Sequence, residues 1–146
     1  MMRFPIAALL IATLAACGSG GSARPADVAR SEVGVRLGAP LFFGSGQVAP
    51  ATFEVTVRNQ ATVPIRVWRI HLSSPSMVQY AIRPVERTFN DSLEPGESKS
   101  FALVTDAVAS APRLDSTEPM NVRVEIDLEA NGHRYRELSN VMGVGQ

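Results

Sequence analysis

Few residues of this 146-residue chain have side chains that can do chemistry. There is one cysteine, Cys17, and there are two histidines, His71 and His133. A single cysteine excludes an internal disulfide framework and a zinc site built on cysteines. The candidate chemistry is therefore modification of the Cys17 thiol, or soft-metal binding by the histidines together with methionines.

The soft-metal site is the weaker of these two interpretations. Imidazole and thioether groups both bind copper, so the histidines could share an ion with methionines. The methionines concerned are Met77, Met120 and Met142. The sequence contains no His-x-His or Met-x-x-Met cluster, and surface histidines with core methionines explain these residues without a metal. We expect no metal site and keep copper binding or delivery as the alternative function.

Catalytic groups are equally scarce. No Gly-x-Ser-x-Gly nucleophile motif occurs, and the glycine-rich run 18–21 lacks the strand and helix of a phosphate-binding loop. Glu125, Asp127 and Glu129 alternate along one segment, which is typical of a solvated strand face opposite basic residues. We expect no enzyme activity, no catalytic residue and no cofactor.

The N-terminus has the pattern of an export signal. Arg3 precedes the apolar run 4–14, whose 11 residues are too few for a permanent membrane span of about 20 residues. The run ends in Leu14-Ala15-Ala16-Cys17. These residues resemble the lipobox of bacterial lipoproteins, in which a leucine and two small residues precede the lipidated cysteine.

The lipoprotein resemblance has consequences for location. It implies cleavage before Cys17, a diacylglyceryl thioether on the cysteine sulfur, and a fatty acyl group such as palmitate on the new amino group. Several acyl chains anchor a protein firmly, because each buried CH₂ contributes about 0.8 kcal/mol. Gly18 rather than aspartate follows the cysteine. The expected location is the cell envelope, at the periplasmic face of the outer membrane in bacteria with two membranes.

The chain divides into three parts. Residues 1–16 form the signal peptide, 17–31 hold the lipidated cysteine and a flexible tether, and 32–146 form one domain. The tether is rich in Gly, Ser, Ala and Pro, and 14 such residues reach about 20 Å as a coil. Lys and Arg number 14 and Asp and Glu 14, so no cationic excess favours a nucleic-acid partner.

Short alternating segments predict strands throughout the domain. Residues 53–58 place Phe53, Val55 and Val57 on one face. In 65–72 the alternation changes phase at Trp68-Arg69, which predicts a β-bulge there. Further strands are predicted over 77–83, 86–89 and 100–104, and 105–119 is interpreted as a long irregular connection. The aromatic residues expected to fill the core are Trp68, Tyr80, Phe53, Phe89 and Phe101.

A hairpin is predicted near the C-terminus. Asn131-Gly132 favours a type I′ turn. The resulting register pairs Leu128 with Tyr135 on the inner face. On the outer face it pairs two acidic with two basic residues, namely Glu129 with Arg134 and Asp127 with Arg136. We expect regular pairing to fail where Ile126 would meet Glu137.

These elements predict an all-β fold, an immunoglobulin-like two-sheet antiparallel sandwich of seven or eight short strands. The order of the turns and strands is informative. A strand ends at Asn59 and is followed by Val63-Pro64-Ile65, and the turn 93–98, which contains Pro95-Gly96, precedes a strand with Phe101. It resembles bacterial extracytoplasmic immunoglobulin-like domains of the water-stress or late-embryogenesis-abundant type. The resemblance covers about residues 51–128, implies the sandwich fold, and carries over no ligand site.

Two features point to a protein partner. Leu41, Phe42 and Phe43 are consecutive, so at least one side chain of an extended segment must leave the interior. Phe42 and Phe43 are candidate partner contacts, with a strand edge tucked under a loop as the alternative. The segment 33–37 is a candidate edge strand to which a partner could add a strand. The expected function is that of a membrane-anchored, non-enzymatic envelope lipoprotein that binds a protein or supports an envelope assembly.

Overall fold

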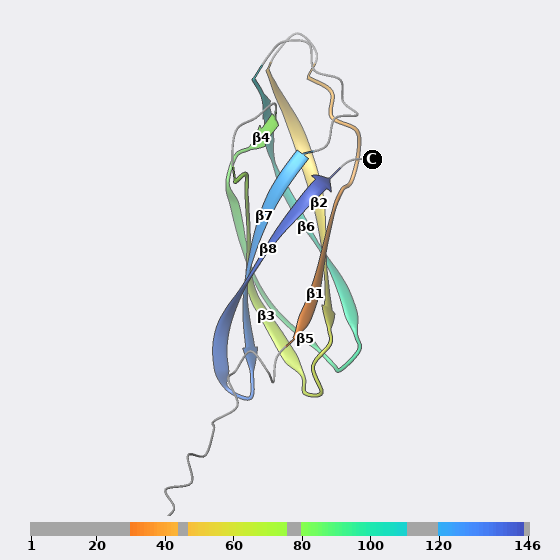
Figure 1. The fold of residues 1–146 in the computed structure, drawn as a ribbon, viewed down its shortest axis with the longest axis vertical. Coiled ribbons are helices and arrows are strands. Elements are labelled where there is room, and N and C mark those ends of the chain that lie inside the picture. Colours follow the sequence, from red (N-terminus) through yellow and green to blue (C-terminus); the bar gives the residue numbers. More distant parts are fainter. Residues whose placement is uncertain (1–29, 44–46, 76–79, 111–119, 145–146) are drawn as a thin grey trace, which may run out of the picture.

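The computed structural model describes residues 30–43, 47–75, 80–110 and 120–144, and this part of the chain is all-β (Figure 1). Within those ranges no helix is long and apolar enough to cross a membrane. The eight strands are β1 (Ser31–Leu37), β2 (Val48–Asn59), β3 (Ile65–Ser73), β4 (Tyr80–Ile82), β5 (Val85–Leu93), β6 (Ser98–Ala109), β7 (Met120–Ala130) and β8 (His133–Val144).

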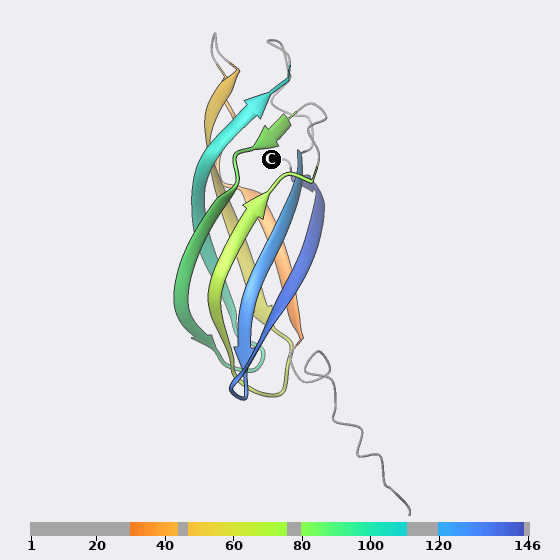
Figure 2. The ribbon, with the colours of Figure 1, turned by 90° about the vertical axis from the view of Figure 1, so that its left-hand side faces the viewer.

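The strands form two antiparallel sheets of four, as the alternating sequence predicts. Sheet A has the order β1-β2-β6-β4 and sheet B the order β5-β3-β7-β8. Figure 2 shows sheet B in front, with β5 and β8 at its two sides. Strands β1-β2-β6 and β3-β7-β8 take the places of the ABE and CFG strands of an immunoglobulin-like sandwich. The expected fold class is confirmed.

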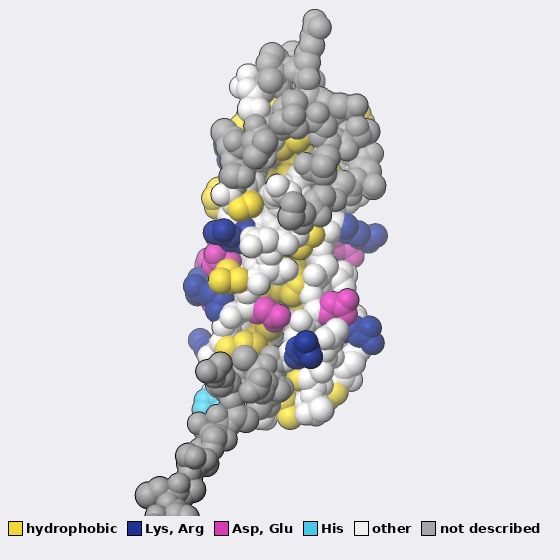
Figure 3. Space-filling model, viewed as in Figure 1, with side chains coloured by type: hydrophobic (Ala, Val, Ile, Leu, Met, Phe, Trp, Pro, Cys, Tyr) yellow, Lys and Arg dark blue, Asp and Glu magenta, His cyan; other side chains and the backbone are white. Residues whose placement is uncertain are grey.

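The core lies between the inner faces of the two sheets. Phe53, Val55 and Val57 are fully buried, which confirms the predicted inward face of β2. Sheet B contributes inward residues of β3 and β7, which are also buried: Ile65, Val67, Ile70, Leu72, Val122, Val124, Ile126 and Leu128. On the face shown in Figure 3, acidic and basic side chains lie together along both flanks, with hydrophobic side chains between them.

Both predicted turns have the expected backbone geometry. Gly96 has φ 82°, and the Glu97 N–H donates to the Glu94 carbonyl at 2.9 Å. Asn131 and Gly132 have φ 51° and 76°, as a type I′ turn requires at both central positions. Positive φ suits glycine because it has no Cβ, so the sequence places glycine where the backbone needs it.

Asn59 at the end of β2 connects two loops of the sandwich. Its side chain is fully buried, and its Nδ2 donates to the carbonyls of Val63 at 2.9 Å and Leu93 at 3.0 Å. Its Oδ1 accepts from the Ala61 N–H at 2.8 Å, and its own carbonyl accepts from the Gly96 N–H at 2.8 Å. The asparagine therefore ties the β2–β3 loop to the Pro95-Gly96 turn.

Several predicted boundaries change. Residues 105–109, expected in an irregular connection, belong to β6 and pair with β2 from Val48↔Val108 to Ala51↔Thr105. Of the strand predicted over 77–83, β4 has only Tyr80–Ile82, and 77–79 lie outside the described residues. The strand predicted over 86–89 extends over the whole of β5.

The predicted failure of the β7–β8 register is wrong. The pairs Leu128↔Tyr135 and Ile126↔Glu137 both form, and pairing continues to Val122↔Val141 before the register shifts. Glu137 is tolerated because β8 is an edge strand, so its inward side lies at the rim of the core rather than inside it. There the Ser31 hydroxyl of β1 donates to the Glu137 carboxylate.

The sandwich has two ends, and we call the one at which β1 begins the tether end, because the expected tether precedes β1 in the sequence, and the opposite one the far end. At the tether end, Ser31 at the start of β1 pairs with Asn59 at the end of β2. The Asn131-Gly132 turn lies at the same end, beside the start of β3, because Ala130 pairs with Ile65. At the far end β1 stops at Leu37 and β2 begins at Val48. As predicted for 33–37, β1 is an edge strand, and among the described residues it pairs with β2 alone.

Candidate functional site

The bulge in β3 places Trp68 on the outer face of sheet B. The register shifts between Val67 and Arg69 against both β5 and β7, as predicted. Val67 and Ile70 point into the core, and the residues between them, Trp68 and Arg69, are half-buried on the outer face. The expectation that Trp68 fills the core is therefore wrong, because the bulge turns two consecutive side chains outward.

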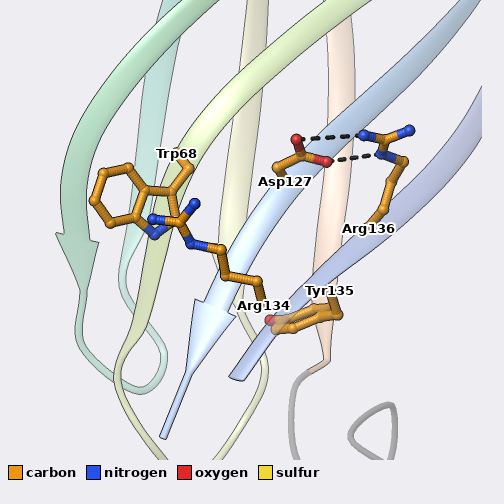
Figure 4. A pocket seen from close by; sticks show the side chains of 5 residues that line it. All are labelled: Trp68, Asp127, Arg134, Tyr135 and Arg136. Carbon is orange, nitrogen blue, oxygen red and sulfur yellow. Dashed lines mark hydrogen bonds and ion pairs between the residues drawn. The ribbon is translucent and has the colours of Figure 1, made fainter. Parts of the chain in front are cut away.

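Arginines and a glutamate surround the Trp68 indole. The guanidinium carbon of Arg134 lies 4.3 Å from the ring centroid and that of Arg66 lies 5.6 Å from it. The indole Nε1 donates to Glu129 Oε2 at 2.9 Å. Figure 4 shows the Arg134 side chain reaching from β8 to the indole on β3. Cation–π contact and the Nε1 bond thus hold the ring in one orientation.

Asp127 forms the second half of the site. Its carboxylate accepts from Arg136 Nε at 2.7 Å and lies 2.6 Å from Arg69 NH2. The hydrogen bond from Arg136, reinforced by the charges of Arg136 and Arg69, lowers the pKa of Asp127 against the opposing effect of partial burial. The predicted Asp127–Arg136 pair is therefore confirmed, as is Glu129–Arg134 at 3.5 Å.

An open hollow of about 380 Å³ lies here, lined by Trp68, Asp127, Arg134 and Arg136, together with Tyr135, which lies between the two arginines on β8 and turns its side chain inward (Figure 4). Two adjacent rows of side chains cross sheet B here. One row has Arg66, Glu129 and Arg134, and the other has Arg69, Asp127 and Arg136. Two further carboxylates flank these rows, because Glu86 lies 3.1 Å from Arg69 and Glu125 lies 3.9 Å from Arg136, so the formal charges of the cluster balance. The guanidinium groups of Arg134 and Arg136 are nevertheless largely exposed, so the hollow offers hydrogen-bond donors to an anionic group beside an aromatic surface.

Of the candidate contact residues at the far end, one is exposed and one is packed. Leu41 is buried at 5 % exposure, whereas the Phe42 side chain is 79 % exposed. The Phe43 ring stacks on Tyr80 with 5.5 Å between centroids. Phe42 is the candidate contact at this end, and Phe43 supports the loop that presents it.

The two histidines lie far apart. His133 is exposed beside the hairpin turn, level with the Ile65–Ala130 pair, and His71 is six residues further along β3. At about 3.3 Å per residue the separation is about 20 Å, too far for one ion. Met120 is buried at 3 % exposure, and the Met77 and Met142 side chains lie outside the described residues. In the described part of the chain, no three His, Cys, Asp or Glu residues are grouped as a metal site requires.

The rim between β1 and β8 contains a buried phenol. Tyr135 faces inward opposite Leu128, as predicted, and its hydroxyl has no hydrogen-bond partner among the described residues. Burial, reinforced by the negative charge of Glu137, raises the pKa of Tyr135 to about 12. The phenol therefore stays neutral at physiological pH, and it packs against the core beside the Ser31–Glu137 contact.

The remaining predicted site lies outside the described residues. It comprises Leu14, Ala15, Ala16 and Cys17. Sequence reasoning missed the Trp68 site, although the phase change at Trp68-Arg69 was the signal for it. A bulge at these residues already implies that both side chains leave the core.

Comparison with known proteins identifies the fold. No protein-family model matches the chain, and no curated protein matches it. A structural-genomics target designated SoR45 has a TM-score of 0.53 at 9 % identity, covering 80 % of this chain and 86 % of the target. The Bordetella pertussis structure named for ApaA has a TM-score of 0.53 at 14 % identity, covering 80 % and 93 %. At these identities the likeness shows a shared β-sandwich fold.

Proposed function

We propose that this protein is a non-enzymatic lipoprotein of the cell envelope that binds a protein partner. Lipidated Cys17 holds it at the membrane, after removal of residues 1–16. The Leu14-Ala15-Ala16-Cys17 sequence after a short apolar run supports the anchor. The outer membrane, on its periplasmic face, is the favoured location where there are two membranes.

The observation that carries the binding function is the Trp68 cluster. Tryptophan and arginine are the residues most enriched where partner binding energy concentrates. Here one half-buried indole is held between Arg66 and Arg134 at the side of an open hollow. A tryptophan fixed in one orientation loses little conformational entropy when a partner covers it.

The geometry relative to the anchor supports two contact regions. A tether of about 20 Å keeps the tether end of the domain close to the membrane. The Trp68 cluster lies toward that end, since Arg66 is the second residue of β3. Phe42 lies at the far end, where a 79 % exposed phenyl ring is accessible from the direction away from the membrane.

The anchor and the partner are tested in one experiment. Cells producing the protein or its Cys17→Ser variant are fed a clickable palmitate. A photo-cross-linking amino acid replaces Trp68, Phe42 or, as a control on the outer face of sheet A, the 66 % exposed Val104. We expect lipid on the wild type alone, and the same cross-linked protein from position 68 or 42 but not from 104. Unlabelled wild type would contradict the anchor, and equal cross-linking from all three positions would contradict a specific partner.

A further inference from the structure

Strand β8 leaves one side of sheet B open. It has 12 residues, and within the described part of the chain it pairs with β7 alone. Figure 2 shows it at the side of the sheet. The unpaired backbone groups of an edge strand are a template for an added strand, and antiparallel pairing is slightly the more stable form.

Charge alternates from strand to strand on the outer face of this sheet. In two successive rows β3 is basic, β7 is acidic and β8 is basic: Arg66–Glu129–Arg134 and Arg69–Asp127–Arg136. In the next row β8 carries Leu138, which is 64 % exposed. At the open edge the outward side chains of β8 are therefore two cations, Arg134 and Arg136, and the apolar Leu138. A fifth strand that continued the alternation of charge would be acidic, acidic and apolar at these three positions.

We propose that the partner adds an extended segment antiparallel to β8, with acidic residues opposite Arg134 and Arg136 and an apolar residue opposite Leu138. From its N-terminus the segment has the pattern apolar-x-acidic-x-acidic. The proposal rests on the protein-binding function above and names the chemistry of the partner. Opposite charges across a ladder stabilise the pairing, and the backbone bonds supply the rest of the affinity.

Both arginines retain donors for such a partner. The side chains of Arg134 and Arg136 are 66 % and 51 % exposed. A guanidinium has five N–H donors. Arg136 gives Nε and NH2 to Asp127, and its NH1 lies 3.9 Å from Glu125, beyond hydrogen-bond distance. Arg134 lies on the indole, with only its Nε at 3.5 Å from Glu129. Because both guanidinium groups lie at the open edge and are more than half exposed, a carboxylate on an added strand can reach them.

The inward side of β8 adds a second requirement. Glu137 points to the rim of the core, where it accepts from the Ser31 hydroxyl. An inward charge on an edge strand normally discourages pairing. A partner residue opposite Glu137 must therefore be a donor such as threonine, and an acidic residue is excluded there by repulsion. An added strand should therefore have acidic residues at the positions opposite Arg134 and Arg136, and none at the position opposite Glu137 between them.

The other edges are less suited to this partner. On the outer face of β1 the two charged residues, Glu32 and Arg36, have opposite signs, so this edge offers no pair of cations. Strand β4 has only three residues. On β5 the outward residues include Glu86, which pairs with Arg69 at 3.1 Å. On β8, by contrast, Arg134 and Arg136 are cations at successive outward positions of an edge strand of sheet B.

The test is a nuclear magnetic resonance titration of the ¹⁵N-labelled full-length protein in detergent. The probe is the synthetic peptide Thr-Leu-Thr-Asp-Thr-Glu-Thr, and the control has the same composition with both acids moved to the other parity. We expect shifts in the β8 amides at millimolar peptide, and affinity about ten-fold weaker for Arg134→Glu or Arg136→Glu, which corresponds to about 1.4 kcal/mol. Milder Arg134→Gln and Arg136→Gln variants give a smaller loss, and the spectra themselves show that each variant is folded.

Two controls separate strand addition from general attraction. Arg58→Glu makes the same charge change at an exposed position on sheet A and leaves affinity unchanged. Two further peptides carry backbone N-methyl groups at alternate residues, one at the odd and one at the even positions. Only one of them has its methyl groups on the amides that face β8, so only that peptide is expected to lose binding. Equal loss with Arg58→Glu, equal binding of both methylated peptides, or unshifted β8 amides would overturn the proposal.

Two further outcomes are distinguishable. Protection of the β8 amides before any peptide is added, with a concentration-dependent doubling of mass, would show that a second copy occupies the edge and would overturn the proposal. A peptide that fails while lipid labelling and site-specific cross-linking succeed would overturn this inference alone. Failure of the cross-linking would contradict the proposed function instead.

Discussion

Replacement of Asn59 by alanine is expected to loosen the tether end of the sandwich. The asparagine is fully buried and makes three side-chain hydrogen bonds, to the backbones of Ala61, Val63 and Leu93. Alanine removes all three and leaves one N–H and two carbonyls of the backbone without that partner. Each such bond contributes about 1 kcal/mol net, so the loss is about 3 kcal/mol.

The expected magnitude is large enough to measure in two ways. For a domain of this size about 1 kcal/mol corresponds to a change of about 4 °C in Tm, so Asn59→Ala lowers Tm by about 12 °C. Urea unfolding gives the free energy directly, and the fluorescence of Trp68, the one tryptophan of the chain, reports it. Asn59→Asp is expected to be at least as damaging at pH 7, because its carboxylate faces the carbonyls of Val63 and Leu93.

The neighbouring residue provides the control. Gln60 is exposed, and its side chain donates to Glu32 at 2.8 Å on the surface. Gln60→Ala is expected to cost less than about 0.5 kcal/mol. If Asn59→Ala and Gln60→Ala lower stability equally, the idea that Asn59 links the β2–β3 loop to the Pro95-Gly96 turn is refuted.

Three other perturbations have defined outcomes. The pKa of the Asp127 carboxyl is lower in the folded protein than in the unfolded chain, so its ionised form stabilises the fold above the ordinary carboxyl pKa of about 4, and this stabilisation is lost as pH falls through the folded-state pKa. Urea unfolding is therefore expected to show the largest difference in free energy of unfolding between wild type and Asp127→Asn at pH 7, and a smaller difference in acid. Gly132→Ala is expected to cost about 1 kcal/mol because φ is 76° there, whereas Gly34→Ala, whose Cβ meets nothing within 4 Å, leaves Tm unchanged or raises it, and equal effects would contradict the turn geometry. Arg134→Ala removes a cation–π contact of about 0.5–1 kcal/mol and increases acrylamide quenching of Trp68, and unchanged quenching would show that the arginine does not cover the ring.

The parts of the fold that the sequence predicted are those set by local chemistry. Alternation in 53–58 determined which face of β2 is buried, and Asn131-Gly132 determined both the turn and the register of the β7–β8 hairpin. The errors arose where position in the sheet decides the outcome. Glu137 fits its register because β8 is an edge strand, which no local pattern shows. Likewise, residues 105–109 extend β6 because β2 is long enough to pair with them.

The candidate site was harder to predict because its residues come from three strands. Cross-strand charge pairs on β7 and β8 followed from the hairpin register, and the structure confirms them. Their meeting with Trp68 required the order of β3, β7 and β8 in the sheet, which alternation alone does not give. The exposed Phe42 was anticipated because three consecutive apolar residues cannot all point inward.

The bulge at Trp68-Arg69 follows from the packing of the core. A β3 without the bulge, in the register of Ile65 and Val67, would turn Trp68 outward alone, bring Arg69 inward, and expose Ile70 and Leu72, which are both fully buried. Exposing these two side chains costs about 3–6 kcal/mol, at about 1.5–3 kcal/mol each, and burying the Arg69 charge costs more. The bulge therefore keeps Ile70 and Leu72 in the core, and the Trp68 indole contributes nothing to core packing. It follows that Trp68→Ala can remove a partner-binding surface and leave the sandwich folded. Loss of cross-linking from position 42 in that variant, while circular dichroism still shows a cooperative unfolding transition and a free energy of unfolding lowered by only about 1–2 kcal/mol through the lost contacts, separates recognition from stability.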